Sequence, residues 1–379
     1  MADKHANYYL GLMSGTSVDS IDAALVDFSD IRPCIVATHE HPMPGKLRRQ
    51  ILSLFEPGGN EIDRMGSLDQ TLGQHFADAA NTLLANSGIP SSAVAAIGSH
   101  GQTIRHRPNA EGEVTQAFTL QIGDPNIIAA RTGITTVADF RRRDMAEGGQ
   151  GAPLAPAFHN ALFRSRSVNR GIVNIGGMSN ITLLPADTSI DALGYDTGPG
   201  NCLMDAWIFR HRQQRYDVDG LWANSGKAHK VLLDTLLAHP YFSAKPPKST
   251  GREEFHLTWL DHTLASLPNV VKTEDVQTSL VELTVETIAL SIEQAPWPIE
   301  EVYLCGGGAD NKELVRRLGK RLKNVTTANT EALGVHPKWV EATAFAWLAM
   351  RRMTGLTGNL PSVTGARKNA VLGAVYAAS

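Results

Sequence analysis

The sequence predicts an α/β protein built from two related halves with a cleft between them. With 379 residues the chain is too long for one average domain, so about two domains are expected. Each half begins with a glycine-marked hairpin, at residues 8–28 and again at 171–184. Each half later has a short apolar strand that ends in a polar or glycine-rich loop, at 97–103 and 304–311. Ligands of open α/β sheets bind where loops leave the carboxyl ends of strands, so these loops predict a ligand site in the cleft.

The elements of the first half follow from apolar periodicity and turn residues. Short apolar runs predict strands at residues 8–13, 23–28, 34–38, 94–98, 118–122 and 134–137. Apolar residues at helical spacing predict helices at residues 46–55, 61–85 and 126–131. The segment DFRRRDMAEGGQG, residues 139–151, combines a basic triplet with several glycines, and we expect a flexible join between the halves there.

The second half is expected to carry more helix than the first. Pro153 is placed to open a helix, because proline suits the first helical turn. Apolar runs predict the two strands of the hairpin at 171–184 and one further strand at 302–305. Helical spacing predicts helices at residues 153–163, 201–212, 227–238, 279–293, 312–322 and 337–353.

Composition describes an ordinary globular protein and excludes some functions. Hydrophobic residues make up 42% of the chain and charged residues 19%, and the net charge of −3 gives no indication of nucleic-acid or anionic-membrane binding. Cys34, Cys202 and Cys305 lie far apart, without the spacing of a metal site or a disulfide framework. No apolar run reaches the roughly 18 residues of a membrane span. We therefore expect a soluble, cytoplasmic protein.

The stretch GLMSGTSVDSID, residues 11–22, is the first candidate site. Its small and hydroxyl residues form a turn that exposes backbone N–H groups and suits phosphate oxygens. The pattern GxxxxGK[ST] occurs nowhere in the chain, which excludes a P-loop. Because the turn has no lysine, Asp19 and Asp22 would repel a polyphosphate unless a cation lay between them, so we expect a nucleotide bound with Mg²⁺. The alternative is a hydrophilic hairpin turn whose Asp and Ser residues make only turn bonds.

Two isolated carboxylates are further candidates. Asp196 lies in GYDTGPGN, residues 194–201, where glycines and proline predict a tight loop before a helix. A carboxylate held rigidly there can meet a substrate, or it can satisfy loop N–H groups or cap the helix. Glu341 lies on an otherwise largely apolar helix, and because buried carboxylates are costly unless paired or used, we favour a functional or paired role.

The basic triplet Arg141, Arg142 and Arg143 cannot all face one ligand. In an extended segment alternate side chains point in opposite directions. One arginine could bind an anionic group bidentately, while the others are solvated or paired with Asp139 and Asp144. The alternative is a triplet that is solvated as a whole.

Three loops complete the candidate set. His100 and Gln102 follow a strand, where polar side chains face the cleft, and the alternative for the histidine is a bond to neighbouring backbone. The polar turn KSTGRE, residues 248–253, either contacts phosphate or sugar or caps a helix. The triple glycine at 306–308 either lets a base or ribose lie against the backbone or makes a tight strand-to-helix turn, and its cost in chain entropy favours the ligand.

Taken together, these motifs resemble the anhydro-N-acetylmuramic acid kinase family over nearly the whole chain. Ten stretches occur in the family's order, which makes the resemblance specific. Ser20 is a departure, because relatives typically carry glycine there and the residue lies inside the proposed phosphate turn. The matching stretches are GLMSGTSVDSID, IGSHGQT, QIGDPN, DFRRRDMAEGGQGAPLAPAFH, VNIGGMSNIT, GYDTGPGN with LMDAW, PKSTGRE, CGGGADN, EATAFAWLA and LPSVTGA.

The resemblance implies a fold and an activity. The fold would be two related actin-like ATPase (ribonuclease H-like) domains flanking an ATP cleft, with residues 1–138 and 366–379 in the first and 139–365, with helical insertions, in the second. The activity would be opening of 1,6-anhydro-N-acetylmuramic acid with ATP and water, with phosphorylation of O6. The products would be N-acetylmuramic acid 6-phosphate and ADP, formed in peptidoglycan recycling and amino-sugar catabolism. We expect this sugar as the substrate, no nucleic-acid or membrane partner, and a homodimer.

The resemblance also assigns roles to residues of this chain. Asp196 would be the general base, and Arg143, Glu341 and His100 would contact the sugar. Asp19 and Asp22 would hold Mg²⁺, directly or through its waters. The residues implied to bind ATP are Gly15, Thr16, Ser17, Val18, Asp19, Ser20, Ile21, Asp22, Gly176, Gly177, Gly306, Gly307 and Gly308.

Two other functions are weighed against this one. A conventional sugar kinase of the same fold would use Asp196 to deprotonate a free hydroxyl. An actin- or chaperone-like ATP-driven scaffold would have no small-molecule substrate. The sequence argues against the scaffold, because it shows no charged interaction tail and no separate client-binding domain.

Overall fold

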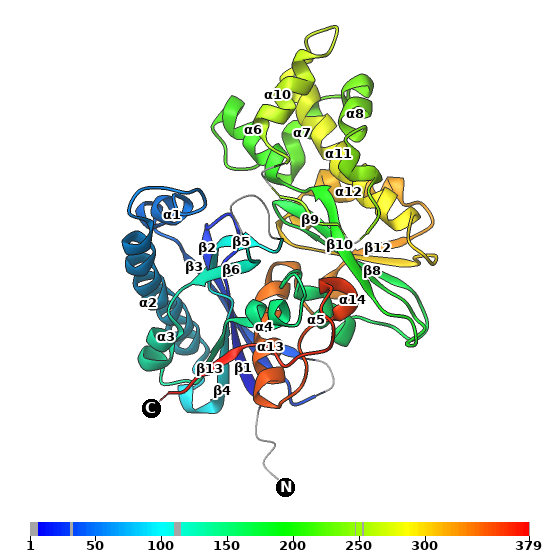
Figure 1. Ribbon diagram of the computed structural model, residues 1–379. Helices are drawn as coiled ribbons and strands as arrows, with labels where there is room; N and C mark the ends of the chain where they lie inside the picture. The colour runs from blue at the N-terminus through cyan, green and yellow to red at the C-terminus, as the bar shows by residue number, and fades with distance from the viewer. Residues whose placement is uncertain (1–6, 31–32, 110–114, 247, 252–253, 379) are drawn as a thin grey trace. The chain divides into compact units, whose positions relative to one another are not determined.

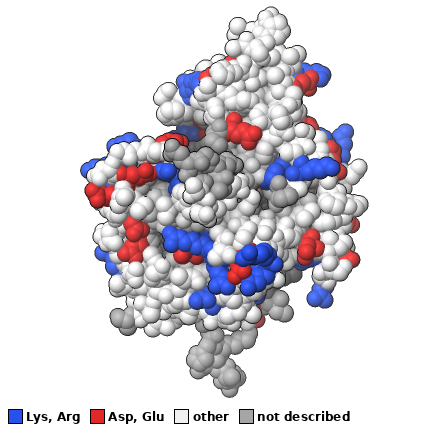
Figure 2. Space-filling model, in the orientation of Figure 1, with Lys and Arg blue, Asp and Glu red and all other residues white. Residues whose placement is uncertain are grey.

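The computed structural model describes residues 7–30, 33–109, 115–246, 248–251 and 254–378. The chain divides into two compact units, the first formed by Met1–Leu162 and Trp339–Ser379 and the second by Phe163–Lys338. Among the described residues, no helix has the length and apolar character needed to span a membrane. On the face drawn in Figure 2, basic and acidic side chains form small groups on a mostly uncharged surface, in agreement with the small net charge.

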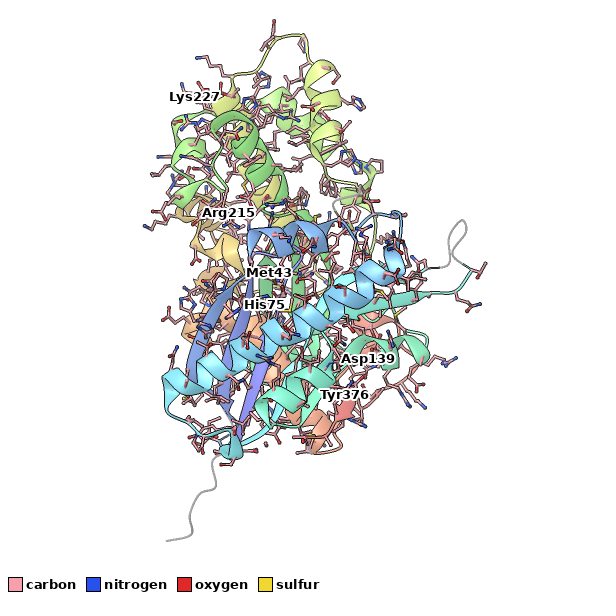
Figure 3. The ribbon with its side chains drawn as sticks, turned by 90° about the vertical axis from the view of Figure 1, so that its left-hand side faces the viewer. Met43, His75, Asp139, Arg215, Lys227 and Tyr376 are labelled. Atoms are coloured by element: carbon pink, nitrogen blue, oxygen red, sulfur yellow. The ribbon has the colours of Figure 1, made fainter. Side chains whose placement is uncertain are left out.

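The described part of the first unit holds a six-stranded sheet in the order β13-β7-β4-β1-β2-β3. Its strands are β1 (Tyr8–Met13), β2 (Ser20–Asp27), β3 (Cys34–Pro42), β4 (Val94–Ser99), β7 (Thr136–Ala138) and β13 (Ala374–Tyr376). A small second sheet pairs β5 (Gln102–Arg107) with β6 (Phe118–Ile122). The helices are α1 (Gly45–Leu52), α2 (Glu61–Ser87), α3 (Pro125–Thr132), α4 (Phe140–Ala146), α5 (Ala155–Leu162), α13 (Val340–Met353) and α14 (Pro361–Thr364). The long helix α2 packs across β2 and β3, and Figure 3 shows His75 on it.

The described part of the second unit holds a five-stranded sheet in the order β10-β9-β8-β11-β12. Its strands are β8 (Arg170–Ile175), β9 (Met178–Leu184), β10 (Leu193–Pro199), β11 (Glu301–Cys305) and β12 (Thr326–Asn329). Helices inserted between β10 and β11 make up much of this unit, as Figure 1 shows. The helices of the unit are α6 (Cys202–Arg212), α7 (Leu221–Ser225), α8 (Lys230–Leu237), α9 (Pro240–Ser243), α10 (Leu257–Ala265), α11 (Thr273–Glu293) and α12 (Lys312–Arg321).

The two sheets share one strand order. In each, an antiparallel three-stranded meander (β1–β2–β3, and β8–β9–β10) is continued from its first strand by two parallel strands (β4 and β7, and β11 and β12). β13 then adds to the first sheet by antiparallel pairing with β7. This matching topology confirms the predicted fold class of two related α/β units.

The border between the units differs from the predicted one. Residues 139–162 and 339–365 belong to the first unit rather than the second. The reason is the packing of α13, which lies against β1 and β4 and against α5. The 139–151 segment is also not a flexible join, because it forms α4 and the buried carboxylate of Asp144 accepts hydrogen bonds from Gly151, Asn359 and Thr364.

Two glycines let α13 approach the first sheet closely. A Cβ atom on Gly11 of β1 would overlap the carbonyl oxygen of Ala342, and one on Gly98 of β4 would overlap that of Phe345. Glycine is therefore required where the helix backbone crosses the strands. The close crossing fixes the first turn of α13, which carries Glu341, relative to β1.

Candidate functional site

The turn between β1 and β2 is shaped by a buried side-chain clamp. The Ser14 hydroxyl donates to Oε1 of Gln102 at 2.7 Å, and Nε2 of Gln102 donates to the carbonyl oxygen of Gly15 at 3.3 Å. Gln102 is fully buried at the start of β5. Val18, also fully buried, adopts a left-handed conformation with φ of 54°. Thr16 and Ser17 stay exposed between these anchors, so the turn presents its small residues to solvent.

Asp19 and Asp22 have different surroundings. An oxygen of Asp19 lies 3.2 Å from Nε of Arg48, which also donates to the carbonyl oxygen of Ser17 at 3.1 Å. Asp22 lies on β2, and its charge is one of the causes that raise the pKa of Glu341. Asp19 is thus tied to α1, while the charge of Asp22 acts on Glu341 in the first turn of α13.

His100, Arg141 and Glu341 form one electrostatic cluster in the first unit. Nη2 of Arg141 lies 2.8 Å from Nε2 of His100, and Nη1 donates to the carbonyl oxygen of Gly151 at 2.8 Å. Burial lowers the pKa of Arg141 to about 10, and the charges of Glu341 and Asp144 oppose that shift. Burial, followed by the charge of Arg141, holds the pKa of His100 well below its ordinary value, so this imidazole is neutral and accepts from the guanidinium. Burial is also the largest cause that raises the pKa of Glu341.

The other two arginines of the triplet point elsewhere, which corrects the expectation of an extended segment. The residues lie on α4, so successive side chains turn by about 100° rather than alternating. Arg142 pairs with Asp139 at 3.4 Å, and Arg143 donates to Glu147 at 2.8 Å, each with 56% of its side chain exposed. The structure brings His100 and Glu341 together around Arg141, and the predicted role of Arg143 at the sugar stays a prediction.

Asp196 lies on β10, an edge strand, rather than in the predicted loop. The pairing of β10 with β9 shifts register between Asp196 and Gly198, and such bulges often redirect a side chain beside an active site. Oδ2 of Asp196 accepts the N–H of Thr250 at 3.0 Å. The first turn of α6 begins after Asn201, so the helix-cap alternative does not describe Asp196.

The glycines of the second unit lie where backbones meet. The carbonyl oxygens of Gly176 and Gly177 accept N–H groups of Asn201 and Gly200 at 2.8 and 2.9 Å. A Cβ atom on Gly306 would overlap Oδ1 of Asn174.

The three glycines at 306–308 have different surroundings. A Cβ atom on Gly308 would overlap the side chain of Ile175, whereas one on Gly307 would have no heavy atom nearer than 4.0 Å. Close packing therefore explains Gly306 and Gly308, and Gly307 is the member of the triplet with room beside it.

Comparison with known proteins identifies the family. A family model described as anhydro-N-acetylmuramic acid kinase matches residues 7–378. The chain belongs to the anhydro-N-acetylmuramic acid kinase family. A relative of that name from Saccharophagus degradans is 52% identical over 97% of this chain and 98% of its own length. Relatives of the same name from Shewanella sp. (strain ANA-3) and Coxiella burnetii are 52% and 51% identical, over 98% and 97% of this chain and 99% and 97% of their own lengths.

Similar solved structures are more distant. An activator of 2-hydroxyisocaproyl-CoA dehydratase from Clostridium difficile, with bound ADPNP, is 12% identical, covers 92% of this chain and 96% of its own, and has a TM-score of 0.46. The ROK hexokinase from Thermus thermophilus is 13% identical, covers 90% of this chain and 99% of its own, and has a TM-score of 0.33.

Several residues of this family member were missed or misjudged from sequence. Gln102 was expected to face a cleft, yet it is buried and braces the Ser14 turn. Arg141 was not distinguished from its two neighbours, although one member of the triplet was expected to differ.

Tyr241, whose hydroxyl donates to the backbone oxygen of Asp196 at 2.6 Å, carries no sequence signal. Within the KSTGRE turn, the backbones of Lys248 and Thr250 both bond Asp196, and residues 252 and 253 lie outside the described residues.

The acidic residues fit a magnesium ion only if a ligand completes the site. Among the described residues, no group of three His, Cys, Asp or Glu side chains is arranged to hold a metal ion. Mg²⁺ is commonly bound through one or two carboxylates together with waters and substrate phosphates, so a sparse carboxylate set is suitable. Asp22 fits this role, since it is only partly buried. Its charge also acts on a second carboxylate, because it raises the pKa of Glu341.

Proposed function

We propose that the protein is an ATP-dependent kinase that opens 1,6-anhydro-N-acetylmuramic acid and phosphorylates O6, giving N-acetylmuramic acid 6-phosphate and ADP. The observation that carries the proposal is family membership over residues 7–378, with relatives of that name at about half identity over nearly their full lengths. Because this substrate is a sugar of the bacterial cell wall, the reaction would serve peptidoglycan recycling and amino-sugar catabolism.

ATP is the phosphoryl donor, and its phosphates bind the exposed part of the β1–β2 turn. Gly15, Thr16 and Ser17 can offer backbone N–H groups and hydroxyls, while the Gln102 clamp keeps the turn in one conformation. In the second unit, Gly307 is the proposed ATP contact with open space beside it. The remaining implied contacts, at residues 18–22, 176, 177, 306 and 308, shape the backbone around these positions.

A magnesium ion would be held by Asp22, directly or through water, with phosphate oxygens of ATP completing its shell. Asp19 is the weaker candidate, because it pairs with Arg48. When bound, the ion would offset negative charge on the transferring phosphoryl group.

Asp196 is the proposed general base. It takes a proton from a water molecule that attacks C1, and the C1–O6 bond breaks. Ordinary glycosidases need a second carboxyl group to protonate the leaving oxygen. Here O6 instead forms a bond to the γ-phosphorus of ATP as ADP leaves, so one carboxylate is sufficient.

The sugar carries a lactyl carboxylate, which needs a cationic partner. Arg143 was the candidate from the resemblance, but Arg141 is the arginine that lies with His100 and Glu341. A guanidinium with restricted hydration binds a carboxylate more strongly than one paired on the surface. We therefore propose Arg141 as the main carboxylate contact, with Glu341 and His100 around it.

A coupled assay of ADP release tests the function. We expect release that depends on 1,6-anhydro-N-acetylmuramic acid, with little turnover of reducing N-acetylmuramic acid. In ¹⁸O-water the label should appear at C1 of the product. Equal turnover of the reducing sugar would indicate a conventional sugar kinase, and label in the phosphate would mean that water attacks phosphorus.

The Asp196→Asn variant tests the base within the same assay. Turnover should fall by about 100-fold or more, because the amide cannot accept the proton, while ATP affinity stays close to that of the wild type. A variant with near-normal turnover would contradict the assignment.

We also propose that the protein is a homodimer and that it lies in the cytoplasm. Both features come from the resemblance to the family. Light scattering after gel filtration should give about twice the mass of one chain, and fractionation of the source cells should recover the protein with cytoplasmic markers.

A further inference from the structure

The segment Lys248–Gly251 contacts Asp196 in the second unit. The carbonyl oxygen of Lys248 accepts the N–H of Asp196 at 3.2 Å, and the N–H of Thr250 donates to Oδ2 of its carboxylate at 3.0 Å. Nearby, the Tyr241 hydroxyl donates to the carbonyl oxygen of Asp196 at 2.6 Å. The backbone N–H, the backbone carbonyl and the side chain of one residue are thus all held.

The segment runs beside the open edge of the second sheet. β10 is the outermost strand of its sheet, so its outer side has no neighbouring strand among the described residues. The bulge after Asp196 interrupts the pairing with β9 at the same position. Support from outside the sheet is needed to fix a carboxylate at such a place, and Lys248–Gly251 supplies it.

A second hydrogen bond fixes the amide that reaches the carboxylate. The Thr250 hydroxyl donates to Oε2 of Glu254 at 2.6 Å, and the N–H of Glu254 donates back to the carbonyl oxygen of Gly251 at 3.3 Å. The next residue, Phe255, is fully buried and stacks on Phe242 with ring centroids 5.4 Å apart. The Thr250–Glu254 bond therefore ties the segment to the core of the unit.

We propose that Thr250 and Glu254 are positioning residues that aim the Asp196 carboxylate. The bond between their side chains sets the Thr250 N–H, and that N–H fixes one carboxylate oxygen and hence the plane of the group. Both residues therefore act on the reaction through Asp196. The inference rests on the proposed function, because it concerns the residue assigned there as the base.

The ionisable groups near Asp196 bear on any pH test. They come from β10 (Tyr195), from α9 (Tyr241) and from the following segment (Lys248 and Glu254), and His239 lies 3.8 Å from Glu254. Burial, then the charges of Asp196 and Glu254, raises the pKa of Tyr241, so it remains a hydroxyl donor in any ordinary assay. Burial lowers the pKa of Lys248, whose ammonium donates to the carbonyl oxygen of Tyr241 at 3.1 Å.

The test is a double-mutant cycle on kcat and KM. Thr250→Val keeps the shape of the side chain but removes the hydroxyl, and Glu254→Leu removes the acceptor. Each should lower kcat by about 10- to 100-fold with KM for ATP and for the sugar nearly unchanged, because a misplaced base slows the chemical step. The double variant should be no slower than either single variant, since each single change already removes the hydrogen bond between Thr250 and Glu254.

Two further measurements distinguish a positioning role of Thr250 from a general loss of structure in the variant. Thr250→Ser, which keeps the hydroxyl, should restore kcat. The acid limb of the kcat–pH profile should move to higher pH in Thr250→Val, since a carboxylate whose N–H donor is no longer held in place is protonated more readily. Thr263→Val on α10, where the hydroxyl bonds the carbonyl oxygen of Trp259 at 3.0 Å, is the matched control and should behave like the wild type.

Wild-type kinetics in Thr250→Val, or fully additive losses in the double variant, would overturn the inference. If Thr250→Val does not fold, Glu254→Leu and Thr250→Ser still decide between the outcomes. Failure of the proposed function would look different, because wild-type protein would then not release ADP with the anhydro sugar, or Asp196→Asn would remain active.

Discussion

Ser14 and Gln102, 88 positions apart in the chain, share a buried hydrogen bond of 2.7 Å at the turn proposed to bind ATP phosphates. The same Gln102 side chain also donates to the carbonyl oxygen of Gly15. A side chain from β5 thereby holds the turn between β1 and β2.

Gln102→Ala should weaken ATP binding and stability together. The change removes the two hydrogen bonds that Gln102 makes with the turn, to Ser14 and to Gly15, and each lost bond costs about 0.5–1.5 kcal/mol. We expect KM for ATP to rise about tenfold, since a cost of about 1.4 kcal/mol corresponds to that factor. Gln70→Ala on α2, which loses an exposed bond of 2.9 Å to Asp124, is the control for both melting temperature and KM. An unchanged KM for ATP in Gln102→Ala would contradict the clamp.

Gly11→Ala and Gly66→Ala should change stability in opposite directions. A methyl group at Gly11 would overlap the backbone of α13 at Ala342, and such overpacking costs about 1–3 kcal/mol or more. Gly66 lies inside α2 with nothing within 4 Å of its added Cβ, so alanine there should stabilise by up to about 1 kcal/mol. Urea denaturation of both variants measures the two effects. A neutral Gly11→Ala would mean that α13 can move away from the sheet at no cost.

Acid should destabilise the first unit through histidines whose pKa values are lowered in the folded state. Burial lowers the pKa of His159 from 6.5 to about 3 and, as the largest cause, that of His106 to about 4. Below pH 6.5 the unfolded chain takes up protons at these positions, whereas the folded chain does so only near the lowered values. Stability from these groups is therefore present above pH 6.5 and is lost as pH falls towards 4.

His159→Gln tests this linkage. One such proton contributes a slope of about 1.4 kcal/mol per pH unit, so the variant's free energy of unfolding should fall less steeply between pH 6 and pH 4. Above pH 7.5 the two curves should run parallel, with an offset for altered packing. Identical slopes would show that His159 does not bind a proton on unfolding in this range.

The sequence was most informative where apolar runs are bounded by turn residues. The bounds of β1 and β6, and the hairpins of both units, follow from such patterns. β10 was missed because its sequence LGYDTGP is rich in turn residues, which an edge strand with a bulge tolerates. Helix α4 was missed because glycines follow it closely, and its stability depends on Asp144 and on residues more than 200 positions away.

Candidate site residues were proposed from sequence when their residue type was unusual for its setting. Glu341 on an apolar helix and Asp196 among glycines belong to this class. The orientation of side chains was not predictable, because it depends on partners distant in sequence. Gln102 is oriented by Ser14, and Arg141 by His100 and Gly151.

Arg141 and Arg143 provide the sharpest comparison for the sugar site. The two side chains differ in setting, since Arg141 is largely buried with His100 and Glu341, while Arg143 is paired with Glu147 and 56% exposed. Arg141→Ala should raise KM for the anhydro sugar by about 10-fold or more, because a charge-assisted hydrogen bond contributes about 1.5–3 kcal/mol. Arg143→Ala should change KM by less than about threefold, because exposed ion pairs contribute little. Steady-state kinetics at saturating ATP measures both, and a larger loss in Arg143→Ala would return the sugar contact to Arg143.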